Sequence, residues 1–174
     1  MVKLQLCTYI NENMEKETLL DPVKVSQYKE IFHFENYLMK SDLSKNMKTL
    51  LKIRVSQINK CAFCIDLHTK DFEDLGESAI RITSINEWRE NNNYNETEKA
   101  LLALAEELSY SSIKTTNQAI EAASRLLDKV SMAQVIAIIL ATNFWNKVFS
   151  GVNDARIFKI PLMAIENTWA TNSL

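Results

Sequence analysis

The chain contains only two glycines, Gly76 and Gly151, in 174 residues. Average glycine usage of about 7% would give roughly a dozen in a chain of this length. Phosphate-binding loops and dinucleotide-binding turns need several glycines at fixed spacing, because there the backbone must approach the phosphate closely. The sequence therefore excludes the common nucleotide-binding folds.

Apolar residues recur at three- and four-residue spacing along most of the chain, which is typical of amphipathic helices. We find no convincing strand, internal repeat or low-complexity linker, and therefore expect an all-α fold. The second helix is expected to begin near Ser41 or Asp42. The predicted helical segments are 21–40, 41–58, 61–75, 95–108, 116–129 and 131–150.

Local signals predict where several of these helices begin and end. Asn95 with Glu98 three residues later forms a capping box, and the string "SMAQ" predicts a second one with Ser131 as the N-cap. Gly76 is expected to end the helix that begins at "CAFC", because glycine adopts positive φ readily. Gly151 is expected to close the last helix.

Length and charge set the broad class of protein. We expect a single domain over residues 1–174, with a core at about 40–150 and peripheral segments at 1–20 and 160–174. The chain has 20 Lys and Arg against 22 Asp and Glu, so no basic field would attract nucleic acid or a membrane surface. No signal peptide is evident, and the apolar stretch "VIAIILA" at 135–141 is too short to cross a bilayer. We therefore expect a cytoplasmic protein. The last helix is apolar nearly all round, so we expect other parts of the protein to cover it on several sides, with a subunit interface as one source of that cover.

The segment "CAFCIDLH" at 61–68 holds two of the three cysteines and one of the two histidines. If 61–75 is helical, Cys61, Cys64 and His68 project from one stripe, and His68 lies one turn from Cys64. A histidine there can accept the proton of a thiol, and a helix N-terminus with nearby lysines favours thiolate. We therefore predict Cys61, Cys64 and His68 as catalytic residues: the two cysteines cycle between dithiol and disulfide, and His68 assists the ionisation of Cys64.

Other interpretations of this segment remain open. A zinc site needs four ligands, and the segment offers three, with only Cys7 and His33 elsewhere. Covalent haem attachment requires a histidine directly after the second cysteine, where Ile65 stands. A purely structural pair of buried cysteines is the third alternative. We predict no metal and no cofactor.

The string "LLKIRVSQINKCAFCIDLHTKD", followed by "LGES", "INEWRE", "ETEKALLALAEEL" and "ATNFWNKV", resembles the alkylhydroperoxidase D-like (AhpD-like) branch of the carboxymuconolactone decarboxylase family. The resemblance covers roughly residues 40–150. It implies an all-helical bundle that forms homo-oligomers, either trimers or hexamers. It also implies a hydroperoxide substrate and a dithiol or lipoyl-type electron donor. Cys64 would attack the peroxide, Cys61 would resolve it as a disulfide, and His68 would belong to the proton relay.

The sequence departs from the family pattern at two positions. Thr49 stands where the family relay usually has a glutamate, twelve residues before the first cysteine, and Lys60 replaces the usual glycine. Candidate carboxylates for the relay are Glu87, Glu106 and Glu107. An alternative function is therefore a catalytically weakened or inactive oligomer that acts as a redox-responsive binding module. Lactone decarboxylation, as in the other branch of the family, does not rest on a C-x-x-C pair.

Other side chains are assigned mainly structural roles. Asn143 and Asn146, on an otherwise apolar helix, are expected to fix packing or subunit register. Lys45, Lys48 and Lys52 are expected to form a solvated stripe. We also expect Arg54 and Gln57 to be solvated or structural. The alternative is that these two side chains orient the site. Aromatic side chains expected in the core or at an interface are Phe63, Trp88, Phe144 and Trp145.

Overall fold

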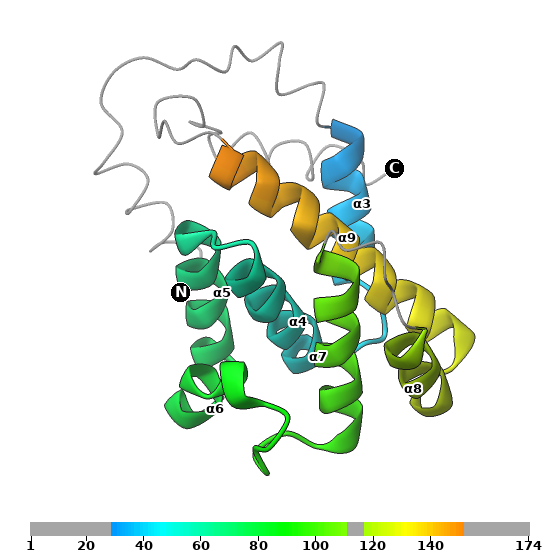
Figure 1. Cartoon of the computed structure of the whole chain (residues 1–174). Coiled ribbons are helices and arrows are strands. Elements are labelled where there is room, and N and C mark those ends of the chain that lie inside the picture. The colour runs from blue at the N-terminus through cyan, green and yellow to red at the C-terminus, as the bar shows by residue number, and fades with distance from the viewer. Residues whose placement is uncertain (1–28, 111–116, 152–174) are drawn as a thin grey trace. The chain divides into compact units, whose positions relative to one another are not determined.

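The computed structural model describes residues 29–110 and 117–151, and every regular element in those ranges is helical, which confirms the all-α prediction there. The α-helices are α3 (Lys29–Met39), α4 (Lys45–Ile58), α5 (Ala62–Asp74), α6 (Ala79–Thr83), α7 (Glu96–Ser109), α8 (Gln118–Leu126) and α9 (Lys129–Gly151), with a 3₁₀ turn η2 (Ile85–Glu87) (Figure 1). The first part of the predicted segment 21–40, and Cys7, lie outside the described residues.

The chain divides into two compact units, of which Leu38–Gly151 holds the helices from α4 to α9. The described part of the other unit is Lys29–Tyr37, within α3. The single domain over residues 1–174 stays a prediction.

Helix α4 lies at the centre of the Leu38–Gly151 unit, with α5 on one side and α7 and α9 on others (Figure 1). Leu51 and Val55 on α4 join a core shared with α7, α8 and α9. Leu50 and Ile53 join a second core beneath α5, α6 and η2. Each fully buried aliphatic side chain contributes about 1.5–3 kcal/mol, so both faces of α4 are firmly held. The end of α4, where the chain turns toward the cysteines, is fixed as a result.

Local sequence signals account for two of the helix boundaries. The Asn95 side chain accepts the Glu98 N–H at 2.9 Å and the Glu98 carboxylate accepts the Asn95 N–H at 3.0 Å, which confirms the capping box of α7. Helix α5 ends at Asp74, and Gly76 follows with φ +85°. Its N–H donates to the Glu73 carbonyl at 2.8 Å, so Gly76 closes the helix as predicted.

The predicted start of α9 at Ser131 is wrong, because Asp128 caps the helix. The Asp128 carboxylate accepts the N–H of Val130 at 2.8 Å and of Ser131 at 3.0 Å, and it also accepts the Ser131 hydroxyl at 2.7 Å. The hydrogen bonds from Ser131 and Val130 hold the pKa of Asp128 below its usual value. A carboxylate suits this position, since the helix N-terminus is partly positive.

The predicted start of α4 at Ser41 or Asp42 is also wrong, because Ser44 caps this helix by accepting the Met47 N–H at 3.2 Å. The preceding turn is instead organised by Lys48, which is only 4% exposed. Its ammonium donates to the carbonyls of Met39 at 2.8 Å and Ser41 at 3.0 Å. The prediction that Lys48 belongs to a solvated stripe is therefore wrong, since its ammonium satisfies the end of α3.

Helix α9 is the one helix in the described ranges that, by length and composition alone, could cross a membrane. The sequence argument considered only the uninterrupted stretch 135–141, which is much shorter than the helix. In the folded unit, Val135, Ile138 and Ile139 are buried in the core with α4 and α7, as a long core helix would be. Leu140 and Phe144 are 53% and 36% exposed, so residues 29–110 and 117–151 leave one side of α9 uncovered.

Candidate active site

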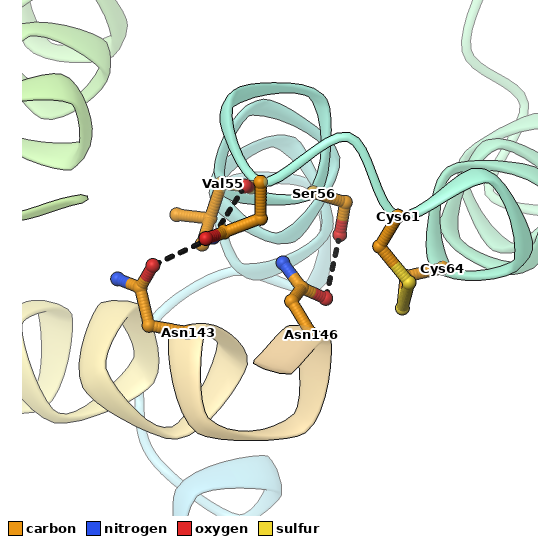
Figure 2. Close-up of a disulfide and its surroundings, with 7 residues drawn as sticks. Val55, Ser56, Cys61, Cys64, Asn143 and Asn146 are labelled. Atoms are coloured by element: carbon orange, nitrogen blue, oxygen red, sulfur yellow. Dashed lines mark hydrogen bonds between the residues drawn. A yellow bond between two sulfur atoms is a disulfide. The ribbon is translucent and has the colours of Figure 1, made fainter. Parts of the chain in front are cut away.

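Cys61 and Cys64 form a disulfide where α4 turns into α5 (Figure 2). Their Cα atoms are 5.3 Å apart, and the residues are 3% and 4% exposed. Cys61 is the N-cap of α5, with extended φ −86° and ψ 91°, and Cys64 lies in the first turn. The expectation that Cys61 begins the helix is therefore wrong by one residue. The expected proximity of the two thiols is confirmed, because the N-cap side chain folds back over the first turn.

The connection between α4 and α5 depends on Lys60, which adopts φ 56°. Residues with a Cβ pay about 1–2 kcal/mol in this left-handed region, which glycine occupies freely. The conformation lets the chain reverse within three residues, and the Cys61 N–H then donates to the Ser56 carbonyl at 3.1 Å. Lys60 thus holds a glycine-type conformation directly before the cysteine pair.

His68 lies one turn after Cys64 on α5 and is largely buried, with 14% of its side chain exposed. Its Nδ1 is 3.4 Å from an Asp71 carboxylate oxygen. A carboxylate beside an imidazole can fix the ring tautomer and raise its basicity. Asp71 was missed by the sequence reasoning, although its position three residues after His68 on one helix was a usable signal.

The three glutamates considered for a relay have other surroundings. Glu106 accepts hydrogen bonds from Arg54 at 2.5 Å, Trp88 at 2.8 Å and Arg89 at 2.5 Å. Burial alone would raise the pKa of Glu106, but these hydrogen bonds outweigh burial and hold that pKa below its usual value. Glu106 is therefore an ionised anchor between helices.

Glu107 and Glu87 each lie in a different environment from Glu106. One Glu107 carboxylate oxygen accepts the Ala119 N–H at 3.3 Å, at the start of α8. Glu87 is exposed in η2. Thr49, at the position of the family glutamate, is buried on α4. The Asp71 carboxylate, in contrast, lies next to His68.

Arg54 and Gln57 are part of the anchor around Glu106. Arg54 also donates to Gln57 at 3.1 Å and to Asn86 at 2.7 Å. These bonds join α4 to η2 and α7 and do not reach the cysteines. A structural role, the main expectation for both side chains, agrees with this geometry.

Two asparagines of α9 face the end of α4 (Figure 2). Asn143 accepts a hydrogen bond from Asn59 Nδ2 at 2.6 Å and donates to Ser109 Oγ and the Ile139 carbonyl, each at 3.0 Å. Asn146 accepts from the Ser56 hydroxyl at 3.3 Å. Both asparagines thus fix the packing of α9, as expected, and the contact of Asn146 with Ser56 lies beside the cysteine pair.

Aromatic side chains gather where α5 begins and α9 ends. Phe63, between the two cysteines, lies with its ring centroid 5.2 Å from that of Phe149. Trp145 is 6.0 Å from Phe149 and 5.2 Å from Phe144. Phe63 and Phe144 are partly exposed, so this aromatic cluster reaches the surface of the protein.

The zinc site named above as an alternative for the cysteine segment requires four ligands close together. Within the described residues, no group of three or more His, Cys, Asp or Glu side chains is arranged to hold a metal ion. Cys61 and Cys64 are bonded to each other. The geometry at the start of α5 is therefore that of a thiol–disulfide pair.

The protein is thus an all-α protein with a C-x-x-C disulfide at the turn between α4 and α5. Residues 28–107 match the model of the Carboxymuconolactone decarboxylase family, and the chain belongs to this family as an AhpD-like member. A similar relative is the uncharacterized protein YdfG of Bacillus subtilis (strain 168), 35% identical over 115 residues. The match covers 66% of this chain and 78% of YdfG.

Two solved structures share the fold. A protein of unknown function from Agrobacterium tumefaciens, ATU0492, provisionally described as the antioxidant defence protein AhpD, is similar with a TM-score of 0.72 and 28% identity. That match covers 82% of this chain and 100% of the other. The debrominase Bmp8, in its apo form, is similar in fold with a TM-score of 0.60 and 19% identity, over 74% of this chain and 68% of Bmp8.

Proposed function

We propose that the protein is a thiol-dependent peroxidase of the AhpD type, which reduces a hydroperoxide with the Cys61–Cys64 pair. The observation that carries this proposal is the bonded pair at the N-terminus of α5, where backbone N–H groups favour thiolate. Membership of the family supports it, as does the likeness to a protein provisionally linked to antioxidant defence.

The reaction has three balanced steps. The Cys64 thiolate attacks the terminal peroxide oxygen, the O–O bond breaks, and an alcohol leaves after protonation, which gives a sulfenic acid on Cys64. The Cys61 thiolate then attacks the Cys64 sulfur and expels hydroxide, which is protonated to water and leaves the disulfide. A dithiol donor, of lipoyl type or similar, reduces the disulfide and is itself oxidised.

His68 is the base that accepts the Cys64 proton in this scheme. Its placement one turn after Cys64 and its contact with Asp71 support that role. The Asp71 carboxylate favours the imidazolium that forms. A His68–Asp71 pair on α5 thus takes the place of a relay through position 49.

The central experiment is a titration of free thiols before and after one equivalent of an organic hydroperoxide. We expect two thiols to disappear, with mass spectrometry locating a new Cys61–Cys64 bond. The Cys61→Ser variant should stop at a Cys64 sulfenic acid, which a dimedone-type reagent traps. If neither the bond nor the sulfenic acid forms in the reduced protein, the peroxidase proposal is wrong.

A second candidate function is a redox-responsive binding module without turnover. The buried Thr49 on α4 favours it, because no carboxylate stands at the family relay position. The Thr49→Glu variant, with Thr49→Gln as its uncharged control, tests this alternative. Hydroperoxide consumption by Thr49→Glu alone would show that the missing acid had silenced the site, whereas turnover by the unaltered protein would exclude the binding module.

Self-association and a cytoplasmic location belong to the same proposal. Leu140 and Phe144, one turn apart on α9, present an exposed apolar strip that a second copy of the chain could cover. We expect a trimer or hexamer by light scattering. The Leu140→Ser variant should weaken it, whereas the same change at exposed Leu126 on α8 should not.

A further inference from the structure

The peroxidase scheme leaves unused a buried polar pair beside the cysteines, Ser56 on α4 and Asn146 on α9 (Figure 2). Ser56 is fully buried and Asn146 is 1% exposed. The Ser56 hydroxyl donates to Asn146 Oδ1 at 3.3 Å, while the Ser56 carbonyl accepts the Cys61 N–H at 3.1 Å. Ser56 therefore links Asn146 to the first cysteine.

The Asn146 amide is incompletely bonded in the disulfide form. Its Nδ2 finds no acceptor among the described residues, although buried amides are normally satisfied. Asn143, one turn earlier on the same helix, has partners for both its oxygen and its nitrogen. The packing of α9 on α4 therefore does not force an asparagine at this interface to leave its NH₂ group unbonded. A different redox state of the cysteine pair could supply the acceptor that the Asn146 NH₂ group lacks in the disulfide form.

Reduction changes the hydrogen-bonding chemistry at this point. A disulfide sulfur is a poor acceptor, whereas a thiolate accepts strong, charge-assisted hydrogen bonds. When a dithiol reduces the pair, the S–S bond breaks and the donor is oxidised to its own disulfide. One cysteine then holds a thiol, the other holds a thiolate, and a proton is released to solvent.

We propose that Ser56 and Asn146 form a hydrogen-bond chain that reverses direction on reduction and stabilises the Cys61 thiolate. In the disulfide form Ser56 donates to Asn146 Oδ1. In the reduced form the Ser56 hydroxyl turns to the thiolate, and the Asn146 amide turns over so that its NH₂ donates to Ser56 Oγ. The two ends of an amide have nearly the same shape, so this rotation needs little space.

In this arrangement Asn146 is a positioning residue that acts through Ser56. The inference rests on the proposed function, because it assigns a role in the step where Cys61 attacks the oxidised Cys64. It also predicts that reduction is easier when both residues are present, since they stabilise the product of reduction.

The experiment measures the reactivity of Cys61 in a background that carries Cys64→Ser and Cys7→Ser, by the pH dependence of iodoacetamide alkylation. Asn146→Leu and Ser56→Ala should each raise the pKa of Cys61 and slow its alkylation at neutral pH by about tenfold, the usual effect of losing one hydrogen bond to a charged group. Asn143→Leu is the matched control, since it removes a bonded asparagine from the same helix. None of these substitutions changes a charge, and the neighbouring Lys60 and Lys147 are exposed.

The control separates a positioning role from general loosening of the fold. If Asn143→Leu lowers the melting temperature as much as Asn146→Leu but leaves the alkylation profile unchanged, the inference is supported. An unchanged profile in both Asn146→Leu and Ser56→Ala would overturn it, as would an equal shift in Asn143→Leu.

A second measurement uses the chain with both cysteines. The reduction potential of the Cys61–Cys64 pair, from equilibration with glutathione, should fall in Asn146→Leu and Ser56→Ala, and a potential equal to that of the unaltered protein would count against the inference. Neither readout needs hydroperoxide turnover. Failure of the unaltered protein to consume peroxide would therefore refute the proposed function alone, whereas normal turnover with unshifted thiols would refute this inference alone.

Discussion

Arg54 on α4 and Glu106 on α7 lie 2.5 Å apart at their closest atoms, with side chains only 11% and 10% exposed. Trp88 and Arg89 complete the shell of donors around the Glu106 carboxylate. A single buried charge thus joins three segments that are far apart in the sequence. Its partners hold α4 in the position from which the chain turns to the cysteines.

Removing the Glu106 charge should destabilise the fold. Glu106→Gln leaves the largely buried Arg54 guanidinium without its counter-ion, and breaking such a pair costs about 3 kcal/mol. The measurement is urea unfolding at pH 7, with Glu107→Gln as the control from the same helix. A loss of stability no larger than that of the control would show that the network is not a major support.

The same carboxylate should make stability depend on pH in the acid range. The pKa of Glu106 is lower in the folded state than in the unfolded chain, so its contribution is present above the unfolded pKa and is lost as pH falls through the folded pKa. Between pH 6 and 3 the unaltered protein should therefore lose more stability than Glu106→Gln. Parallel pH curves for the two proteins would contradict this.

Lys48 should act in the opposite pH range. Burial, followed by repulsion from Lys52 and Lys45, lowers the pKa of Lys48 in the folded state. The unfolded chain then binds more protons just below pH 10.5, so stability should rise with pH between the folded and unfolded pKa values. Lys48→Met should remove this rise, whereas Lys45→Met at the exposed start of α4 should retain it. The free energy of unfolding from pH 8 to 10.5 gives the comparison.

Lys60→Gly should stabilise the protein. Glycine relieves the left-handed strain before Cys61, which is worth about 1 kcal/mol, less a smaller loss from the freer unfolded chain. Lys60→Ala is the control, because it removes the same charge but keeps the Cβ. An equal gain in both variants would assign the effect to charge, and no gain in Lys60→Gly would contradict the prediction.

His68→Ala should slow the alkylation of Cys64 several-fold at neutral pH, since the nearby base is lost. Asp71→Asn should give a smaller decrease, because it weakens the imidazolium without removing the ring. The experiment uses the Cys61→Ser background, so that only Cys64 of the pair reacts. An unchanged rate in His68→Ala would exclude the histidine as the proton acceptor.

The features that the sequence predicted correctly are those fixed by neighbouring residues. The Asn95–Glu98 capping box and the Gly76 helix end each depend on a few adjacent positions, and the two bonded cysteines are separated by only three positions in the sequence. The start of α9 was misplaced because two capping residues, Asp128 and Ser131, compete within one turn. The Asp128 carboxylate accepts hydrogen bonds from two backbone N–H groups, so Asp128 is the N-cap.

The features that were missed depend on contacts between distant segments. Ser56 and Asn146 are 90 residues apart, and only the packing of α9 on α4 brings them together. Lys48 was assigned to a solvated stripe because helical spacing alone cannot show that its ammonium donates hydrogen bonds to carbonyls of the preceding turn. The resemblance to a family directed attention to the cysteine pair, but it could not identify the polar side chains that lie beside that pair here.

The position of the disulfide, between the N-cap and the first turn of α5, determines how much the bond contributes to the stability of the fold. The two cysteines are only three residues apart, so the bond closes a very small ring and restricts the unfolded chain by only about 2 kcal/mol on the chain-entropy relation. The two cores around α4, rather than this bond, keep the helices together. Opening this bond would therefore change the resistance of the chain to unfolding only slightly, so a catalytic cycle of the proposed kind would leave the helical scaffold intact.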